Sequence, residues 1–400
     1  MSVSTLRQFL EFINSRSINS FITPASRLSI VCGNESADFD SVSSALSYAY
    51  FDYLYQVQTS QLNNITPLVP VINIPHEDLK LRKDITFMLE KEYSISEDLL
   101  FFHEDLIRWK TENNGLQIDA VLVDHNELVN ESKKLIDNVI GIIDHHEDLG
   151  LYTDAKPRIV QVTGSCTSLV YNYWNGKIED KSAMNDMIKF MYGAVLLDTA
   201  NFKHKVEDPD REAVKSYQLF ESESKMNLLS QDGKDTFSQE QFFKTLKKAK
   251  KDITGLSVRD IMKKDYKQFE FNVGSTGKSI TVGIGSMVKS LKWLYKEYNG
   301  VEIFREECEK YRKEFNLDVV VVMSSSNDKK TGSFNREMAL VSSPENQALV
   351  MKMIDAMTPI LQLEPHKHIP TATCWEYKQL NVDASRKQVV PCIKRVLEQL

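Results

Sequence analysis

Short apolar runs alternate with amphipathic stretches through the first half of this 400-residue chain. The runs are "RLSIVCGN", "LVPVINIP", "DAVLVDHNE", "NVIGIIDHHE" and "RIVQVTGS", with helical spacing between them, as in "DLKLRKDITFMLEKEY". A short apolar run bounded by turn residues is typical of a strand in a parallel sheet, because helices cover both faces of such a sheet. Parallel strands also require crossover connections. The sequence therefore predicts an α/β domain built on a mostly parallel sheet.

A polar segment, "SKMNLLSQDGKDTFSQE" (224–240), ends this alternation. Beyond it, "FEFNVGSTGKSITVGIG" predicts two strands around a Gly-rich turn, and "LDVVVVMSSS" predicts another buried strand. Helical patterns cover 285–314, 344–358 and 383–399. We place the first domain at residues 1–225, a linker at 226–240, and a second, smaller α/β domain at 241–400.

The segment "GSTGKS" (274–279) is interpreted as a hairpin turn and not as a phosphate-binding P-loop. The P-loop motif requires a glycine at the position of Asn272. It also requires a helix after the lysine, whereas a strand pattern follows here.

Composition excludes several classes of protein. The five cysteines are scattered, with no C-x-x-C pair, which is typical of a reduced intracellular protein. A net charge of −7 disfavours a general nucleic-acid binder. No apolar stretch has the length of a membrane-spanning helix, and the N-terminus lacks a signal-peptide core. We expect a cytoplasmic monomer without nucleic-acid or membrane partners, and two N-terminal arginines leave a minor mitochondrial pool open.

Acidic and imidazole side chains follow the apolar runs, and the carboxyl edge of a parallel sheet would gather them. They are Asp38, Asp40, Asp124, Asp144, His145, His146 and, after an apolar helix, Asp198. Taken singly, an aspartate at such a place is more often a turn or helix-cap residue. Several carboxylates at one edge would raise one another's pKa, and divalent metal ions are the usual remedy. The set therefore predicts a two-metal site of the kind that activates water in phosphoryl transfer.

Four of these segments carry a family resemblance. "ADFDS", "VDHNE", "DHHED" and "LLDTANF", in this order, resemble the four motifs of the DHH phosphoesterase superfamily. "IMKKDYKQFEF" and "ASRKQVVP" resemble the substrate-binding motifs of the second domain of family II inorganic pyrophosphatases and yeast-type exopolyphosphatases. The resemblance spans nearly the whole chain and is nearest to the fungal exopolyphosphatases, through "GNESADFDS", "GIIDHHEDL" and "KKDYKQF".

The resemblance implies a set of metal ligands and catalytic residues. Asp38 resembles a ligand of one metal ion and Asp40 a ligand of the other. Asp124 and Asp198 resemble the ligands shared by both ions, and His145 the imidazole ligand. The implied catalytic residues are Asp124, Asp198 and His146, which resembles the residue that hydrogen-bonds the substrate phosphate.

The resemblance also implies residues that act around the ligands. Asp144 resembles a carboxylate that orients the histidine pair, and Asn34 and His125 stand beside the ligands. Lys267, Arg386 and Lys387 resemble a cationic clamp on the substrate, in which a guanidinium grips phosphate with two parallel hydrogen bonds.

Some residues keep two interpretations. His125 belongs either to the surroundings of the metal ligands or to a surface turn. Lys203 and Lys205 either line a polyanion channel, and so bind substrate, or are solvated, and the basic run 244–252 is more typical of a solvated helix face. Ser165 either caps a helix or offers amides to phosphate, and capping is the commoner role.

Asn34 stands where the pyrophosphatases have a histidine ligand. The loss of a nitrogen ligand favours the harder Mg²⁺, although Mn²⁺ or Co²⁺ can substitute.

The resemblance implies an exopolyphosphatase, which hydrolyses the terminal phosphoanhydride bonds of linear inorganic polyphosphate and releases orthophosphate. Its active site, with two divalent metal ions, is expected in the cleft between the two domains. An inorganic pyrophosphatase with the same site is the first alternative. A DHH nuclease or nucleotide phosphodiesterase is disfavoured, because the sequence lacks the Gly-rich motif usual in their second domain. A non-catalytic polyphosphate sensor is disfavoured by the intact ligand set.

Overall fold

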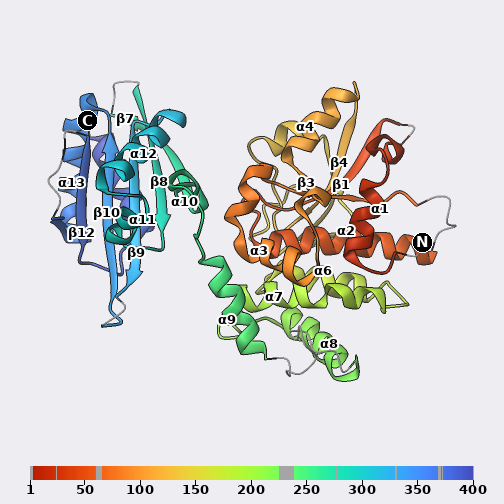
Figure 1. Cartoon of the computed structure of the whole chain (residues 1–400). Helices are drawn as coiled ribbons and strands as arrows, with labels where there is room; N and C mark the ends of the chain where they lie inside the picture. Colours follow the sequence, from red (N-terminus) through yellow and green to blue (C-terminus); the bar gives the residue numbers. More distant parts are fainter. Residues whose placement is uncertain are drawn as a thin grey trace. The chain divides into compact units, whose positions relative to one another are not determined.

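The computed structural model describes residues 3–23, 25–59, 65–224, 238–274, 278–328, 331–367, 371 and 373–399. The chain divides into two compact units, Met1–Asp252 and Ile253–Leu400 (Figure 1). Each unit has its own sheet and its own hydrophobic core, which confirms the predicted two-domain α/β architecture. Among the described residues, no helix combines the length and apolar character needed to span a membrane.

The described residues of the first unit form a six-stranded sheet in the order β3-β2-β1-β4-β5-β6. The strands are β1 (Arg27–Cys32), β2 (Val69–Ile72), β3 (Phe101–Phe102), β4 (Gln117–Val123), β5 (Asn138–Asp144) and β6 (Arg158–Val160). Every neighbouring pair is parallel, as predicted. Because β2 and β4 lie on opposite sides of β1, the strand order reverses between β1 and β4. Open α/β sheets bind ligands in the crevice at the carboxyl ends of such strands.

Helices cover both faces of this sheet. They are α1 (Leu6–Asn14), α2 (Phe39–Thr59), α3 (Lys83–Phe87), α4 (His103–Glu112), α5 (Ser132–Leu135), α6 (Cys166–Asn175), α7 (Ile188–Asp198), α8 (Asp208–Ser224) and α9 (Gln239–Lys250). In Figure 1, α2, α6 and α7 lie on one side of the sheet and α4 on the other. The small residues of "SVSSALSYA" at the start of α2 let it pack closely against the sheet, α6 and α7.

The helix expected over "DLKLRKDITFMLEKEY" is interrupted. The segment contains a 3₁₀ helix (His76–Leu81), α3 and a π-helical turn (Met88–Glu92). The break falls at Arg82, whose φ of −103° and ψ of 62° are not helical. Its guanidinium donates to the carbonyl oxygen of Ser36 at 2.6 and 2.9 Å, a long-range contact that helical periodicity does not reveal.

The boundary between the units lies after α9. Phe242, Phe243 and Leu246 of this helix are buried, and α9 packs against α3 and α7 of the first unit. The second unit therefore starts at Ile253, whereas the sequence placed the start of the second domain at 241. Most of the expected linker, 226–237, lies outside the described residues.

The described residues of the second unit form a mixed sheet in the order β11-β12-β10-β9-β8-β7. Its strands are β7 (Tyr266–Val273), β8 (Lys278–Met287), β9 (Val319–Asn327), β10 (Phe334–Ser342), β11 (Leu363–Pro365) and β12 (Cys374–Gln379). Strands β8 and β9 are parallel, and β7 and β8 are antiparallel, as the predicted hairpin requires. The turn residues 275–277 of this hairpin lie outside the described residues.

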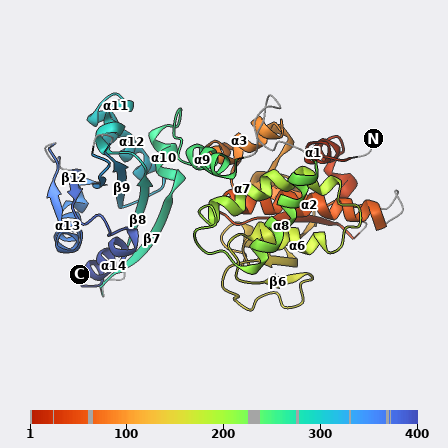
Figure 2. The same ribbon diagram turned by 90° about the horizontal axis from the view of Figure 1, so that it is seen from below.

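Helices also cover both faces of the second sheet. They are α10 (Val258–Lys264), α11 (Leu291–Glu297), α12 (Val301–Glu314), α13 (Gln347–Leu361) and α14 (Arg386–Glu398). Figure 2 shows α11 and α12 on one side of the sheet and α14 on the other. The helix predicted over 285–314 starts later, because β8 continues to Met287. It is also divided by Asn299 and Gly300, both with positive φ.

Candidate active site

A cavity of about 250 Å³ lies at the carboxyl ends of β1, β4 and β5, where the strand order reverses. Its lining residues are Asn34, Ser36, Asp38, Asp40, Asp124, His145, His146, Gly164, Asp198 and Lys205. All five side chains that the sequence predicts as metal ligands are among them. They come from four segments of the chain: Asp38 and Asp40 follow β1, Asp124 follows β4, His145 follows β5, and Asp198 ends α7.

Asp124 follows β4 and is fixed through its backbone and its carboxylate. Its φ of 61° is left-handed, a conformation that aspartate adopts more readily than most residues. The side-chain amide of Asn34 donates to Oδ2 of Asp124 at 2.8 Å. The amide oxygen of Asn34 instead accepts from the backbone N–H groups of Ser36 and Ala37, at 2.9 and 3.2 Å. Asn34 thus orients Asp124, and its own oxygen is engaged in the turn before α2.

Asp38 caps α2 and also lines the cavity. Its Oδ1 accepts from the backbone N–H of Ser41 at 3.1 Å, so capping is its observed role, and its place in the cavity is compatible with the predicted ligand role. Gly33 makes this close turn possible, because a Cβ there would lie 2.3 Å from the Ser41 hydroxyl oxygen. That hydroxyl accepts from the backbone N–H of Asn34 at 2.7 Å.

The two histidines are held by different partners. Nδ1 of His145 lies 3.0 Å from the carbonyl oxygen of Thr163, and its Nε2 lies 3.1 Å from Oδ1 of Asp124. Nδ1 of His146 lies 2.8 Å from Oδ1 of Asp144, and the His146 side chain is 58% exposed. Asp144 therefore orients the ring of His146, whereas Thr163, which sequence reasoning missed, orients the ring of His145.

Asp40 is buried at the N-terminus of α6. Its carboxylate accepts from the backbone N–H groups of Cys166 and Thr167, at 2.7 and 2.9 Å, and from the hydroxyl groups of Ser165 and Thr167. Ser165 is the N-cap residue of α6, but its hydroxyl donates to the Asp40 carboxylate and does not accept from a backbone N–H of the helix. The positive end of the helix dipole thus faces this carboxylate.

A second buried carboxylate, Asp210 of α8, holds the same loop from its other side. It accepts from the backbone N–H of Gly164 at 2.8 Å and from the Ser168 hydroxyl at 2.7 Å. The backbone N–H groups of Ser165 and Glu207 donate to it as well, at 3.3 and 2.9 Å. Asp210 is fully buried and therefore fixes the loop that in turn fixes Asp40.

Burial and mutual repulsion disfavour ionisation of these acids. Burial, followed by the charge of Asp40, raises the pKa of Asp124 to about 8. Burial and the charges of Asp40 and Asp38 raise the pKa of Asp198 well above its usual value. Asp198 also ends α7, where the helix dipole places partial negative charge. The pKa of Asp38 is raised by burial and by Asp40.

The histidines respond to the same carboxylates. Burial opposes protonation of His145, but the hydrogen bond to Asp124 and the charge of Asp40 raise its pKa to about 10. Burial likewise opposes ionisation of Asp144, but hydrogen bonds from His146 and Asn126 hold its pKa below the usual value. The cavity therefore favours positive charge among its carboxylates.

The donor set fits divalent metal ions. Ligand atoms of Asp124, His145 and His146 lie within 4.8 Å of one another. Oδ2 of Asp198 is buried and has no hydrogen-bond partner among the described residues. With Nδ1 of His145 donating to Thr163, its Nε2 is the atom left for a metal. Carboxylate oxygens with an imidazole suit Mg²⁺, Mn²⁺ or Co²⁺.

The basic residues near the cavity differ in part from those that the sequence predicts. Lys205 lines the cavity, whereas Lys203 is exposed and not among its lining residues. The charges of Lys250, in α9, and of Arg82 oppose the rise in the pKa of Asp38, and Lys250 does the same for Asp198. In the sequence, Lys250 is one of several lysines in the basic run of α9. This run does not reveal which lysine lies near the carboxylates of the cavity.

His125 lies beside the ligands and not on a fully exposed turn. Its Nδ1 is 2.9 Å from the carbonyl oxygen of Val123, and burial lowers its pKa. Together with Asp124, Asp144 and His146, it lines an adjacent cavity of about 430 Å³.

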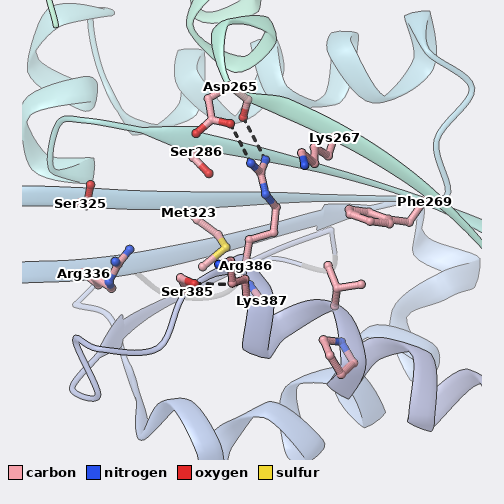
Figure 3. Close-up of a pocket in the computed structure, with 12 residues that line it drawn as sticks. Asp265, Lys267, Phe269, Ser286, Met323, Ser325, Arg336, Ser385, Arg386 and Lys387 are labelled. Carbon is pink, nitrogen blue, oxygen red and sulfur yellow. Dashed lines mark hydrogen bonds and ion pairs between the residues drawn. The ribbon is translucent and has the colours of Figure 1, made fainter. Parts of the chain in front are cut away.

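The second unit contains a cavity of about 520 Å³, shown in Figure 3. The predicted clamp residues Lys267, Arg386 and Lys387 all line it. Lys267 lies on β7, and the other two begin α14, whose N-terminal amides add positive potential. The guanidinium of Arg386 pairs with Asp265 at 2.8 Å. Arg336 of β10 lines the same cavity and was missed by sequence reasoning.

Comparisons with known proteins agree with this two-part arrangement. The profile "DHH family, N-terminal domain" matches residues 29–197, and the profile "DHHA2 domain" matches residues 244–396. A Schizosaccharomyces pombe protein named "Putative exopolyphosphatase" is 32% identical over 396 residues, which cover 95% of this chain and 94% of that protein. A "Manganese-dependent inorganic pyrophosphatase" of Methanothrix thermoacetophila is 26% identical over 264 residues, covering 64% of this chain and 68% of that protein.

A solved structure resembles most of this chain in fold. It is described as a "putative family II inorganic pyrophosphatase" of Methanococcus jannaschii, with a TM-score of 0.50 and 20% identity. The match covers 92% of this chain and 99% of that chain, and at this identity it shows a shared fold.

Proposed function

Because this chain belongs to the DHH family and carries a DHHA2 domain, we propose that it is an exopolyphosphatase, a hydrolase that releases orthophosphate from the ends of linear inorganic polyphosphate. The observation that carries the proposal is the assembly of the five ligand-type side chains Asp38, Asp40, Asp124, His145 and Asp198 in one cavity. A separate cavity in the second unit, lined by several cations, supports the proposal, because such a cavity is suited to an anion.

The proposed cofactors are two divalent metal ions, with Mg²⁺ preferred and Mn²⁺ or Co²⁺ able to substitute. When bound, such ions supply positive charge for the developing phosphoryl transition state and lower the pKa of the attacking water. Asp124 and Asp198 would bind both ions. Asp38 would bind one ion and Asp40 the other, and His145 would bind a metal ion through Nε2. Mg²⁺ is preferred because Asn34 replaces a nitrogen ligand.

The remaining side chains of the first cavity act on the substrate and on the ligands. His146 is half-exposed and anchored through Nδ1 by Asp144, so that its Nε2 is available to a phosphate oxygen. Lys205 adds positive charge at the cavity, and Lys203 would extend the basic surface for a longer chain. Asn34 keeps Asp124 in place, and His125 packs beside it.

One polyphosphate chain is proposed to engage both cavities. Lys267, Arg386 and Lys387 would then hold phosphate groups while a terminal group lies among the metal ligands. Charge-assisted hydrogen bonds from these residues favour a polyanion over a neutral substrate. We further propose that the protein is a cytoplasmic monomer that acts on polyphosphate and not on nucleic acid or membranes.

An inorganic pyrophosphatase is the second candidate, favoured by the relatives of that name and by the "DHNE" segment at 124–127. The deciding experiment measures phosphate release from long-chain polyphosphate, tripolyphosphate and pyrophosphate, each with Mg²⁺, Mn²⁺ and Co²⁺. We expect release from the two longer substrates and little from pyrophosphate. Release from pyrophosphate alone would replace the proposal with the second candidate.

A further inference from the structure

The cavity of the second unit carries more positive charge than the predicted clamp accounts for. Lys267, Arg336, Arg386 and Lys387 line it, against the single carboxylate of Asp265. The chain as a whole is acidic, with a net charge of −7, so this concentration of cations is a local feature. A cavity with several cations and a helix N-terminus is suited to a polyanion.

Arg336 is the cation of this cavity that the family motifs do not explain. It lies on β10 directly opposite Ser325 of β9, and both residues line the cavity. Its Nε donates to the carbonyl oxygen of Val382 at 2.7 Å, which fixes the direction of the guanidinium. No carboxylate among the described residues pairs with it, in contrast to Arg386, which pairs with Asp265. The remaining guanidinium N–H groups are therefore available to an anion.

The strand register places Arg336 far from Lys267 on the same face of the sheet. Lys267 aligns with Ile284, which aligns with Val321, which in turn aligns with Leu340. Arg336 lies four residues before Leu340 on β10. Three strand spacings of about 4.8 Å and four residues of about 3.4 Å put the two Cα atoms roughly 20 Å apart.

Figure 3 shows the order of these residues along the pocket. Arg336 lies at one end of the pocket, Lys267 and Phe269 lie at the other, and Arg386 lies between them. A single phosphate group held by Lys267 and Arg386 would leave Arg336 without an anion. Successive phosphate groups of one chain would reach both ends.

We propose that Arg336 and Ser325 form a second phosphate subsite, so that the second unit binds at least two phosphate groups of one polyphosphate and thereby selects for chain length. This inference rests on the proposed function and refines its substrate class. It makes Arg336 a specificity-determining residue, because the contact exists only for substrates longer than the clamp.

The test measures binding of orthophosphate, pyrophosphate, tripolyphosphate and a longer polyphosphate to the full chain in chelator, by calorimetry. In the unmodified protein, affinity should rise with chain length. Arg336→Gln should weaken binding of tripolyphosphate and longer chains about tenfold, which is about 1.4 kcal/mol, and leave orthophosphate binding within twofold. Arg386→Gln should weaken binding of every ligand in the series.

Two further variants separate this role from a structural one. Arg395→Gln makes the same charge change in α14, outside the cavity, and should leave the whole series unchanged. Arg336→Lys keeps the charge and should restore part of the chain-length dependence. Unchanged orthophosphate binding by Arg336→Gln also demonstrates that its cavity is folded.

The outcomes distinguish the subsite from the proposed function. If the affinity of Arg336→Gln depends on chain length as it does in the unmodified protein, the subsite proposal is wrong, whatever substrate the enzyme hydrolyses. If the unmodified protein releases no phosphate from polyphosphate with any metal, the exopolyphosphatase proposal fails, and the binding series still decides the subsite.

Discussion

At the scale of single residues, the carboxylates of the first cavity differ in what they touch. Asp124 and Asp198 carry raised pKa values and lie among the other acids, whereas Asp144 bonds His146 and Asn126. We expect Asp124→Asn and Asp198→Asn to lower kcat/KM for polyphosphate by more than 100-fold, because each removes a ligand proposed to serve both ions. Asp144→Asn should cost roughly 10–100-fold, because it loosens only an orienting contact. The reverse order would show that the ligand assignment is wrong.

Asn34 gives a residue-scale prediction about metal preference. An imidazole is a better ligand than an amide for Mn²⁺ or Co²⁺, so Asn34→His should raise the affinity for these ions. It should also raise the activity on pyrophosphate relative to polyphosphate, because pyrophosphate offers few remote phosphates and depends more on the metals. The measurements are Mn²⁺ titration and kcat/KM for both substrates in Mg²⁺ and Mn²⁺. If both the affinity and the ratio stay constant, Asn34 does not control the metal site.

Much of the site could be predicted at this scale, because strand-end acids and a His pair are visible as short motifs. Thr163, Lys250 and Arg336 could not be predicted. Thr163 acts through its backbone carbonyl, which no motif records. Lys250 is one of several lysines on α9, and only the packing of that helix brings its charge near Asp38. Arg336 lies on a strand that the sequence pattern did not indicate.

At the scale of elements, the N-terminus of α6 depends on a carboxylate from α8. Asp210→Asn would turn an N–H₂ group toward N–H donors, so we expect a loss of about 1–3 kcal/mol in the free energy of unfolding. Because the loop also holds Asp40, Mn²⁺ affinity should fall even where the variant is fully folded. Urea unfolding and Mn²⁺ titration measure the two effects. Asp208→Asn, on the exposed side of the same helix, is the control and should change neither.

A buried carboxyl in α2 gives a prediction about pH. Burial raises the pKa of Asp52 to about 6, although the Gln56 side chain donates to it at 2.6 Å. A folded pKa above the unfolded value means that the folded state is destabilised as pH rises from about 4 through about 6. Asp52→Asn removes this loss, so the variant should be more stable than the unmodified protein above pH 6, by up to about 3 kcal/mol.

The measurement is urea unfolding at pH 4.5 and pH 7.5. The advantage of Asp52→Asn should be much larger at the higher pH, because only about a third of the loss has developed at pH 4.5. Asp154→Asn, at an exposed position of the same unit, should show no such dependence. An equal advantage at both pH values would mean that ionisation of Asp52 is not its cause.

At the scale of the whole molecule, metal binding should stabilise one unit and not the other. The five proposed metal ligands all lie in the first unit, so a divalent ion at 100 times its Kd should add about 2.7 kcal/mol there. For a unit of this size, the Tm should rise by roughly 5–10 °C. Scanning calorimetry with Mg²⁺, Mn²⁺ and excess chelator measures this shift, and activity should vanish in chelator. Full activity in chelator would contradict the metal-dependent proposal.

The two-unit organisation could be predicted from the alternation of strands and helices and from the polar segment after it. The unit against which helix α9 packs could not be predicted. Helix α9 follows the polar segment in sequence, yet Phe242 and Leu246 pack against the first unit, and a local pattern does not reveal which surface an amphipathic helix covers. In the same way, helical periodicity over 78–93 does not show that Arg82 bonds Ser36 and interrupts the helix.

The ion pair between Arg386 and Asp265 means that the cavity of the second unit holds its own competitor for ligands. Any anion that uses this guanidinium must displace or share a carboxylate that is tethered 2.8 Å away. A polyphosphate that reached several cations at once would make more contacts with which to displace this carboxylate, whereas a lone orthophosphate would exchange one counter-anion for another. Competition from Asp265 would favour release of the bound anion as well as limit its binding. An enzyme that shortens a chain step by step needs both binding and release.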